Sequence, residues 1–170
     1  MKHLYFVRHG LSLMNQQGFF SGLTDTPLTN EGRQQAIDAG KLLQTANVDC
    51  IVASPITRAF DTACLIATEI GYDSDNIITS DHFIERDFGP LEGTTYSPDL
   101  PLDTIDGVEH SRDLVERVAL GLEFIKSLEA DTILVVSHGA VGRALRYLVQ
   151  DETPFHGSEK FLNGEVVKLI

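Results

Sequence analysis

Cysteine is scarce in this sequence, and the placement of the two cysteines excludes several kinds of site. Cys50 lies beside a predicted strand and Cys64 falls within a predicted helix, without the Cys-x-x-Cys spacing that metal and redox motifs use. A chain of 170 residues can bury a full core without disulfides or a structural metal. We therefore expect two reduced thiols that pack against other side chains.

Basic residues are also few, and they form no cluster. The chain has 13 Lys and Arg residues against 25 Asp and Glu residues, which gives a formal net charge of -12. A negative charge of this size repels nucleic acid and anionic membrane surfaces. We therefore expect no nucleic-acid partner and no membrane partner.

Long apolar runs are absent as well. No run approaches the roughly 20 residues that a membrane-spanning helix needs. The sequence begins with a strand-like segment, where a secretory signal would show a charged region followed by an apolar one. The expected location is the cytoplasm. The oligomeric state is left open, with a homodimer as one option.

Short apolar segments alternate with amphipathic segments along the chain. The first apolar segment lacks the alternation of a half-exposed strand, so we expect it to be buried on both faces. Ser54 and Pro55 are typical of a helix N-cap and first helical position, and Gly71 is typical of a helix end. The pattern predicts strands at 4–7, 49–53, 76–79, 132–137 and 165–169, and helices at about 29–45, 55–70, 114–128 and 139–149.

This order of elements predicts an α/β fold. Alternating strands and helices favour a three-layer α/β/α sandwich, in which helices cover both faces of a mostly parallel central sheet. We expect residues 1–170 to form a single domain. The region between residues 87 and 107 is rich in glycine, proline and acidic residues, which is typical of a functional loop. We therefore expect a short lid segment, defined as residues 90–108.

Chemically active side chains follow three of the predicted strands. Arg8 and His9 follow the first strand, Arg58 follows the second, and His138 follows the strand at 132–137. Ligands of such sheets bind beyond the carboxyl ends of the strands. Two imidazoles and two guanidinium groups suit a tetrahedral dianion, because a neutral imidazole can attack phosphorus while arginines balance the charge on its oxygens. Helix starts after Ser54 and at Gly139 would add backbone N–H groups.

Four motifs in order along the chain resemble the histidine phosphatase superfamily, also called the phosphoglycerate mutase-like family. The resemblance covers nearly the whole chain and implies the fold described above, in a branch of phosphatases with a small lid. The motifs are Arg8-His9-Gly10 with Ser12, Asn15 and Thr26-Pro27-Leu28-Thr29; Ser54-Pro55-Ile56-Thr57-Arg58-Ala59; Ile84-Glu85 with Phe88-Gly89 and Glu92-Gly93; and Ser137-His138-Gly139.

The resemblance also implies the role of each matching residue. His9 would be the nucleophile that becomes phosphorylated, with Arg8, Arg58 and His138 as the other members of the phosphate pocket. Glu85 would protonate the leaving-group oxygen and later activate water. The resemblance implies no metal and no cofactor. Further residues expected to contact phosphate or substrate are Asn15, Ser21, Gly22 and Gly139.

The chain departs from the family pattern around the lid segment. Leu91 stands where the family commonly has tryptophan, and His110 stands where many members have serine. The lid segment carries Asp99, Asp103 and Asp106 but no lysine or arginine. These carboxylates would repel a second phosphate or a carboxylate on the substrate. We therefore expect hydrolysis of a monophosphate whose body is neutral or cationic.

Other interpretations remain open. The chain could be a mutase acting on a phosphorylated sugar acid, or a regulatory module that binds phosphate without catalysis. A histidine after a strand is often structural, which applies to His138 taken alone. Glu92 and Glu109 are expected to be structural or lid residues. His82, His110 and His156 share no ligand-like spacing, so we expect surface or loop histidines.

Overall fold

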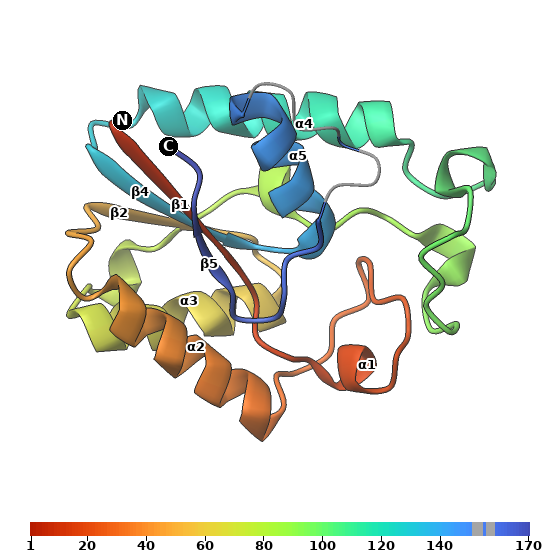
Figure 1. Cartoon of the computed structure of the whole chain (residues 1–170), viewed down its shortest axis with the longest axis horizontal. Coiled ribbons are helices and arrows are strands. Elements are labelled where there is room, and N and C mark those ends of the chain that lie inside the picture. The colour runs from red at the N-terminus through yellow and green to blue at the C-terminus, as the bar shows by residue number, and fades with distance from the viewer. Residues whose placement is uncertain (151–154, 156–158) are drawn as a thin grey trace.

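A five-stranded sheet forms the centre of the molecule (Figure 1). A computed structural model describes residues 1–150, 155 and 159–170 of the chain. The strand order is β3-β2-β4-β1-β5, in which the first four strands are parallel and β5 runs antiparallel to β1. The strands are β1 (His3–Arg8), β2 (Cys50–Ala53), β3 (Ile78–Thr79), β4 (Thr132–Ser137) and β5 (Val166–Lys168).

Four long helices cover the two faces of the sheet (Figure 1). Alternate residues of β4 divide between the layers: Ile133 packs into a core with α4 and α5, and Leu134 packs into a core with α2 and α3. The predicted three-layer α/β/α sandwich is therefore confirmed. These helices are α2 (Asn30–Leu43), α3 (Thr57–Ile70), α4 (Ser111–Ser127) and α5 (Gly139–Val149), and the short helix α1 (Leu13–Gln16) follows β1.

Two predicted element boundaries were wrong. Helix α3 begins at Thr57, and its N-cap is Ile56 without a side-chain hydrogen bond. Ser54 is not the N-cap: its hydroxyl accepts from the Ile56 amide at 3.3 Å, before the helix begins, and also lies 2.8 Å from Nε2 of the fully buried His138. The strand predicted at 76–79 is shorter, since residues Ser74–Asn76 form a 3-10 turn and only Ile78–Thr79 pair with β2.

The start of α2 is held against the end of β1 by a close contact between two glycines. A Cβ atom on Gly10 would overlap with the Gly32 carbonyl, so only glycine allows the two backbones to approach this closely. The Leu11 amide donates to Gln35 Oε1 at 2.8 Å, which fixes the same turn from the helix side. The chain that leaves His9 is therefore firmly positioned.

The lid segment packs across the loop that follows α1. The Phe20 amide donates to the Thr94 carbonyl at 2.9 Å, and Phe19 and Thr95 form an antiparallel bridge. The lid segment also contains most of one 3-10 turn, Gly89–Leu91, and all of another, Leu102–Thr104. Both cysteines are free thiols, as expected: Cys50 is buried and Cys64 is half-buried.

No helix among the described residues has the length and apolar character needed to cross a membrane.

Candidate active site

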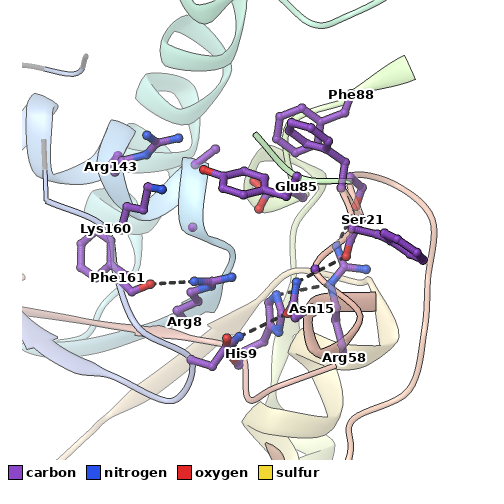
Figure 2. Close-up of a pocket in the computed structure, with 18 residues that line it drawn as sticks. Arg8, His9, Asn15, Ser21, Arg58, Glu85, Phe88, Arg143, Lys160 and Phe161 are labelled. Atoms are coloured by element: carbon purple, nitrogen blue, oxygen red, sulfur yellow. Dashed lines mark hydrogen bonds between the residues drawn. The ribbon is translucent and has the colours of Figure 1, made fainter. Parts of the chain in front are cut away.

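A cavity of about 230 Å³ lies beyond the carboxyl ends of β1 and β4, where ligands of parallel sheets are expected (Figure 2). Its walls come from distant parts of the sequence: the end of β1, the loop after α1, the start of α3, the lid segment, α5 and the segment before β5. The lining residues include Arg8, His9, Asn15, Phe19, Phe20, Ser21, Gly22, Arg58, Glu85, Phe88, Tyr96, Gly139, Arg143, Lys160, Phe161 and Asn163.

His9 is a buried, neutral imidazole. Its ring is 2% exposed, and its Nδ1 lies 2.7 Å from the Gly10 carbonyl oxygen. A carbonyl can only accept a hydrogen bond, so Nδ1 carries the proton and Nε2 carries none. Burial, and then the charges of Arg58 and Arg8, hold the pKa of His9 well below its usual value of 6.5. The ring is therefore available as a nucleophile at neutral pH.

Arg58 connects His9 to the loop after α1. The guanidinium is fully buried, and its Nε donates to His9 Nε2 at 3.3 Å. Its Nη1 donates to the Thr24 carbonyl at 2.9 Å and its Nη2 to the Gly22 carbonyl at 2.6 Å. Burial lowers the pKa of Arg58, while the carboxylates of Glu85 and Asp25 raise it. The loop therefore fixes the guanidinium beside the nucleophile.

Two buried polar atoms near His9 have no hydrogen-bond partner among the residues that the structure describes. Arg8 donates through Nη1 to the Phe161 carbonyl at 2.7 Å, but its Nε has no partner. His138 packs edge-on against His9 with ring centroids 5.1 Å apart, and its Nδ1 also has no partner. Buried polar atoms are rarely left unpaired. The two exceptions therefore belong to residues that the sequence predicts to hold phosphate.

Glu85 lies on the cavity wall with 9% of its surface exposed. Its Oε1 accepts a hydrogen bond from the Arg86 amide at 2.9 Å. The backbone before Glu85 is held by Arg117 of α4, whose Nη1 donates to the carbonyls of His82 and Ile84 at 2.9 and 3.0 Å. Arg117 is in turn paired with the Glu109 carboxylate at 2.9 Å. Glu109 is thus structural, as expected.

The structure brings the predicted site residues together. Eight of the nine line the cavity, namely Arg8, His9, Asn15, Ser21, Gly22, Arg58, Glu85 and Gly139. The ninth, His138, packs edge-on against the His9 ring and does not line the cavity. Asn15 donates to Ser21 Oγ at 3.4 Å, which places both on one wall (Figure 2). The expected phosphate pocket therefore has its residues in one place.

The comparison with protein families agrees with this geometry. The sequence model of the histidine phosphatase superfamily (branch 1) matches residues 4–169. The chain belongs to the histidine phosphatase superfamily. The uncharacterized phosphatase PhoE of Bacillus subtilis is 30% identical over 168 residues, covering 96% of this chain and 86% of that protein.

Two other known proteins are similar to this chain over much of their length. A 2,3-bisphosphoglycerate-dependent phosphoglycerate mutase of Rhizobium etli is 32% identical over 170 residues, covering 86% of this chain and 79% of that protein. A mycobacterial glucosyl-3-phosphoglycerate phosphatase, solved with VO3, superposes with a TM-score of 0.85 at 24% identity, over 99% and 92% of the two chains. The chain spans only 40% of the length of some mycobacterial relatives at 32% identity.

Several residues that line this histidine phosphatase cavity were not predicted from the sequence. Arg143 lies four positions after Gly139, on the same face of α5, and this spacing could have revealed it. Lys160 and Asn163 come from an irregular segment without a motif. Asn163 donates through Nδ2 to the His9 carbonyl at 3.0 Å, so the last part of the chain closes the floor of the site.

The structure does not support the expected repulsion by the lid segment. None of Asp99, Asp103 and Asp106 lines the cavity. Asp103 pairs with the buried Arg86 at 2.6 Å and accepts from the Ser111 amide at 2.8 Å, contacts that hold its pKa at about 2 despite burial. Its charge is therefore compensated where it lies, and the carboxylates give no reason to prefer a neutral or cationic substrate in this superfamily member.

The remaining histidines fall into three cases. His110 is exposed, as expected, but it also caps α4 by accepting from the Arg112 amide through Nδ1 at 3.1 Å. His82 is half-buried and lies outside the cavity lining. His156 lies outside the described residues. No group of three or more His, Cys, Asp or Glu side chains in the described part of the chain could share a metal ion.

Proposed function

We propose that this protein hydrolyses a small phosphomonoester through a phosphohistidine at His9, without a metal ion. The observation that carries the proposal is the hydrogen bond from His9 Nδ1 to the Gly10 carbonyl at 2.7 Å, which leaves Nε2 unprotonated in a cavity lined by guanidinium groups. A neutral imidazole with its proton on Nδ1 can attack phosphorus with the lone pair of Nε2. A fold of this superfamily and phosphatase-named relatives support the proposal.

In the first step, His9 Nε2 attacks phosphorus and the bond to the leaving oxygen breaks. Glu85, protonated at this stage, gives its proton to the leaving oxygen, so that a neutral alcohol departs. Arg8 and Arg58 balance the charge on the oxygens of the transferring group. The Arg8 Nε, which has no partner among the described residues, is a donor that a phosphate oxygen in the cavity would satisfy. His138 packs edge-on against the His9 ring and would hold that ring in position.

In the second step, water releases the phosphate. The Glu85 carboxylate takes a proton from the attacking water, the P–N bond breaks, and the electron pair returns to His9 Nε2. Glu85 ends the cycle protonated and His9 ends it neutral, so both are ready for the next substrate. The burial and neighbouring cations that lower the pKa of His9 favour the neutral ring as the leaving group of this step.

The test is to trap the phosphoenzyme. Rapid acid-free quenching during turnover of a ³²P-labelled aryl phosphate should give label that is stable to alkali, lost in acid and located on the peptide containing His9. His9→Asn should abolish both the label and the turnover, while EDTA should change neither in the native protein. The matched control is His3→Asn at the exposed far end of β1, which should retain both. Turnover in His9→Asn, or loss of turnover in EDTA, would contradict the proposal.

A mutase is the second candidate function. Arg143 and Lys160 add cations to the cavity beyond those beside His9, and mutase-named relatives are similar over most of the chain. The two functions differ in the fate of the phosphoryl group, which a mutase returns to the substrate. Faster isomerisation than phosphate release in the presence of a bisphosphate primer would favour the mutase. A purely regulatory phosphate-binding module would show neither reaction and no labelled His9.

A further inference from the structure

The cavity carries more positive charge than one phosphoryl group requires. Within the described residues its lining contains four cations, Arg8, Arg58, Arg143 and Lys160, and one carboxylate, that of Glu85. A phosphomonoester dianion has two negative charges, which the two arginines beside His9 can balance. Arg143 and Lys160 are left over. This excess is local, because the whole chain has a net charge of -12.

Arg143 and Lys160 both line the cavity, from α5 and from the segment before β5. Figure 2 shows both above Phe161, across the cavity from Ser21 and Phe88. Arg143 projects from α5, and Lys160 precedes Phe161 in the segment that leads to β5. The charge of Arg143 contributes to lowering the pKa of Arg8, so the field of Arg143 reaches the phosphate pocket.

No carboxylate among the described residues neutralises either cation. Neither Arg143 nor Lys160 takes part in the ion pairs that these residues form. Lys160 Nζ lies 4.9 Å from the centre of the Tyr96 ring, and Arg143 Cζ lies 5.7 Å from the centre of the Phe155 ring. Aromatic faces orient a cation without cancelling its charge. Both charges therefore remain available to a ligand.

The two cations differ from His9 in depth. His9 is 2% exposed, whereas Arg143 is half-buried and Lys160 is exposed beside Tyr96, a lid residue that is itself 42% exposed. A molecule with its phosphate at His9 would therefore extend toward these cations at the mouth. The walls along the way are largely aromatic, formed by Phe19, Phe20, Phe88, Tyr96 and Phe161.

We infer that Arg143 and Lys160 form a subsite for a second anionic group, a carboxylate or a second phosphate, on the alcohol part of the substrate. The inference rests on the proposed function, because it places the transferred phosphoryl group at His9. Arg143 can bind such a group with two parallel hydrogen bonds, and Lys160 adds a more exposed point charge. The substrate class is then a phosphomonoester with an anionic body, the opposite of what the acidic lid segment predicted.

Three esters that differ at one end test this subsite. Glycerol 3-phosphate ends in a neutral hydroxyl, 3-phosphoglycerate ends in a carboxylate, and glycerol 1,3-bisphosphate ends in a second phosphate. The native protein should show a higher kcat/KM for one or both anionic esters than for glycerol 3-phosphate, and the better of the two identifies the group. Arg143→Gln should lower this preference by about tenfold or more, the effect of a lost hydrogen bond to a charged group. Lys160→Gln should lower it by roughly twofold to fivefold, as for an exposed ion pair.

Control variants separate this local effect from a change in overall charge. Arg112→Gln and Lys126→Gln remove one exposed cation each from α4, where both are paired with neighbouring carboxylates, and should leave the preference unchanged. The double variant Asp99→Asn and Asp106→Asn should also leave it unchanged, since neither carboxylate lines the cavity. A rise in preference in that double variant would restore repulsion by the lid segment and overturn the subsite.

Further outcomes also decide the inference. Equal loss of activity on all three esters in Arg143→Gln, with no change of preference in Lys160→Gln, would show a general role and overturn the subsite while the phosphatase remains. Arg143→Lys, which keeps the charge, should keep part of the preference. If the protein hydrolyses neither these esters nor an aryl phosphate, the proposed function fails separately. Calorimetric Kd values of the three esters, undisturbed by turnover, would then give the preference, and equal values would overturn the subsite.

Discussion

The chemistry of His9 depends on the few groups that surround its ring. The Gly10 carbonyl selects the tautomer, Arg58 contacts the free nitrogen, and burial disfavours the imidazolium. His138 shares this environment, because burial and the charge of Arg58 also hold its pKa well below the usual value. Two histidines are thus kept neutral in the folded protein. An unfolded chain has no such constraint, so the difference affects stability as well as catalysis.

This difference predicts a loss of stability in mild acid. Below a pH of about 6.5, histidines of the unfolded chain bind protons while His9 and His138 do not, so the free energy of unfolding falls as the pH falls. Each buried histidine contributes a slope of up to about 1.4 kcal/mol per pH unit in this window. The slope should extend down to the folded-state pKa values, and above 6.5 the contribution should vanish.

Urea unfolding at pH 5.0, 5.5, 6.0, 7.0 and 8.0 measures the slope. His9→Asn and His138→Asn should each flatten the acidic part of the curve, even if they lower the stability at neutral pH. His3→Asn removes an exposed histidine at the other end of β1 and provides the control. Parallel curves for native protein and both buried variants would show that these rings do not resist protonation.

Single residues also show where sequence reasoning succeeded in the site. The catalytic candidates were found because strand ends and motifs fix their position in this fold, which applies to His9, Arg58 and Glu85. Lys160 and Asn163 were missed because an irregular segment brings them to the cavity through tertiary contacts alone. The acids of the lid segment gave a misleading expectation about the substrate, because the sequence does not show which group an acidic side chain contacts. Asp103 pairs with the buried Arg86.

Among the elements, the lid segment and the loop after α1 act on the active site through Glu92. Its carboxylate accepts from the amides of Leu23 and Thr24 at 2.8 and 2.9 Å and from the Thr24 hydroxyl at 2.6 Å. The Thr24 carbonyl in turn accepts from Arg58. A Cβ on Gly22 would overlap with the Glu92 carboxylate, and the φ of Gly22 is +52°, so this turn requires glycine. Glu92 is structural, as expected, and it is placed to hold Arg58 in position.

We therefore expect Glu92→Gln to weaken catalysis more than folding. The amide keeps the shape of the side chain but replaces one acceptor oxygen with an NH2 donor that faces backbone amides. The loop after α1 then loses hydrogen bonds to residue 92, and Arg58, which donates to that loop, is displaced. A displacement of this kind, of about 1 Å, costs about 100-fold in rate. The measurement is kcat on an aryl phosphate together with the urea midpoint. Glu123→Gln, an exposed change on α4, is the control. Unaltered kcat in Glu92→Gln would show that the loop holds Arg58 without the carboxylate.

Element boundaries show what local sequence signals can and cannot decide. Gly71 ends α3 in the left-handed region at a φ of 71°, as its sequence predicts, because few other residues adopt that conformation. Ser54 and Pro55 carry an equally clear helix signal, yet α3 starts later. The Ser54 hydroxyl accepts from the Ile56 amide in the turn before the helix and also contacts His138, which lies 84 positions later in the sequence. A local signal thus marks this turn, but it does not decide at which residue the helix begins.

At the scale of the whole molecule, the cavity depends on both ends of the chain. Arg8 of β1 donates to the Phe161 carbonyl, the Gly164 amide donates to the Arg8 carbonyl at 2.9 Å, and Asn163 donates to the His9 carbonyl. The layers and the parallel sheet could be predicted, because alternating apolar and amphipathic segments have few other solutions. The closing of the site by the segment before β5 could not, because no periodicity marks that segment.

This dependence predicts that activity and fold are lost together. The cavity takes residues from β1, α3, the lid segment, α5 and the segment before β5, so no smaller unit retains it. If residues 1–170 form a single domain, as we expect, urea should give one cooperative transition, with the same midpoint for aryl phosphatase activity, far-ultraviolet ellipticity and tyrosine fluorescence. The sequence has no tryptophan, so a Phe161→Trp variant would add a probe at the cavity itself. Activity that disappears at a lower urea concentration than the ellipticity would mean that the lid segment or the closing segment detaches first, and that the site and the sheet are separate cooperative units.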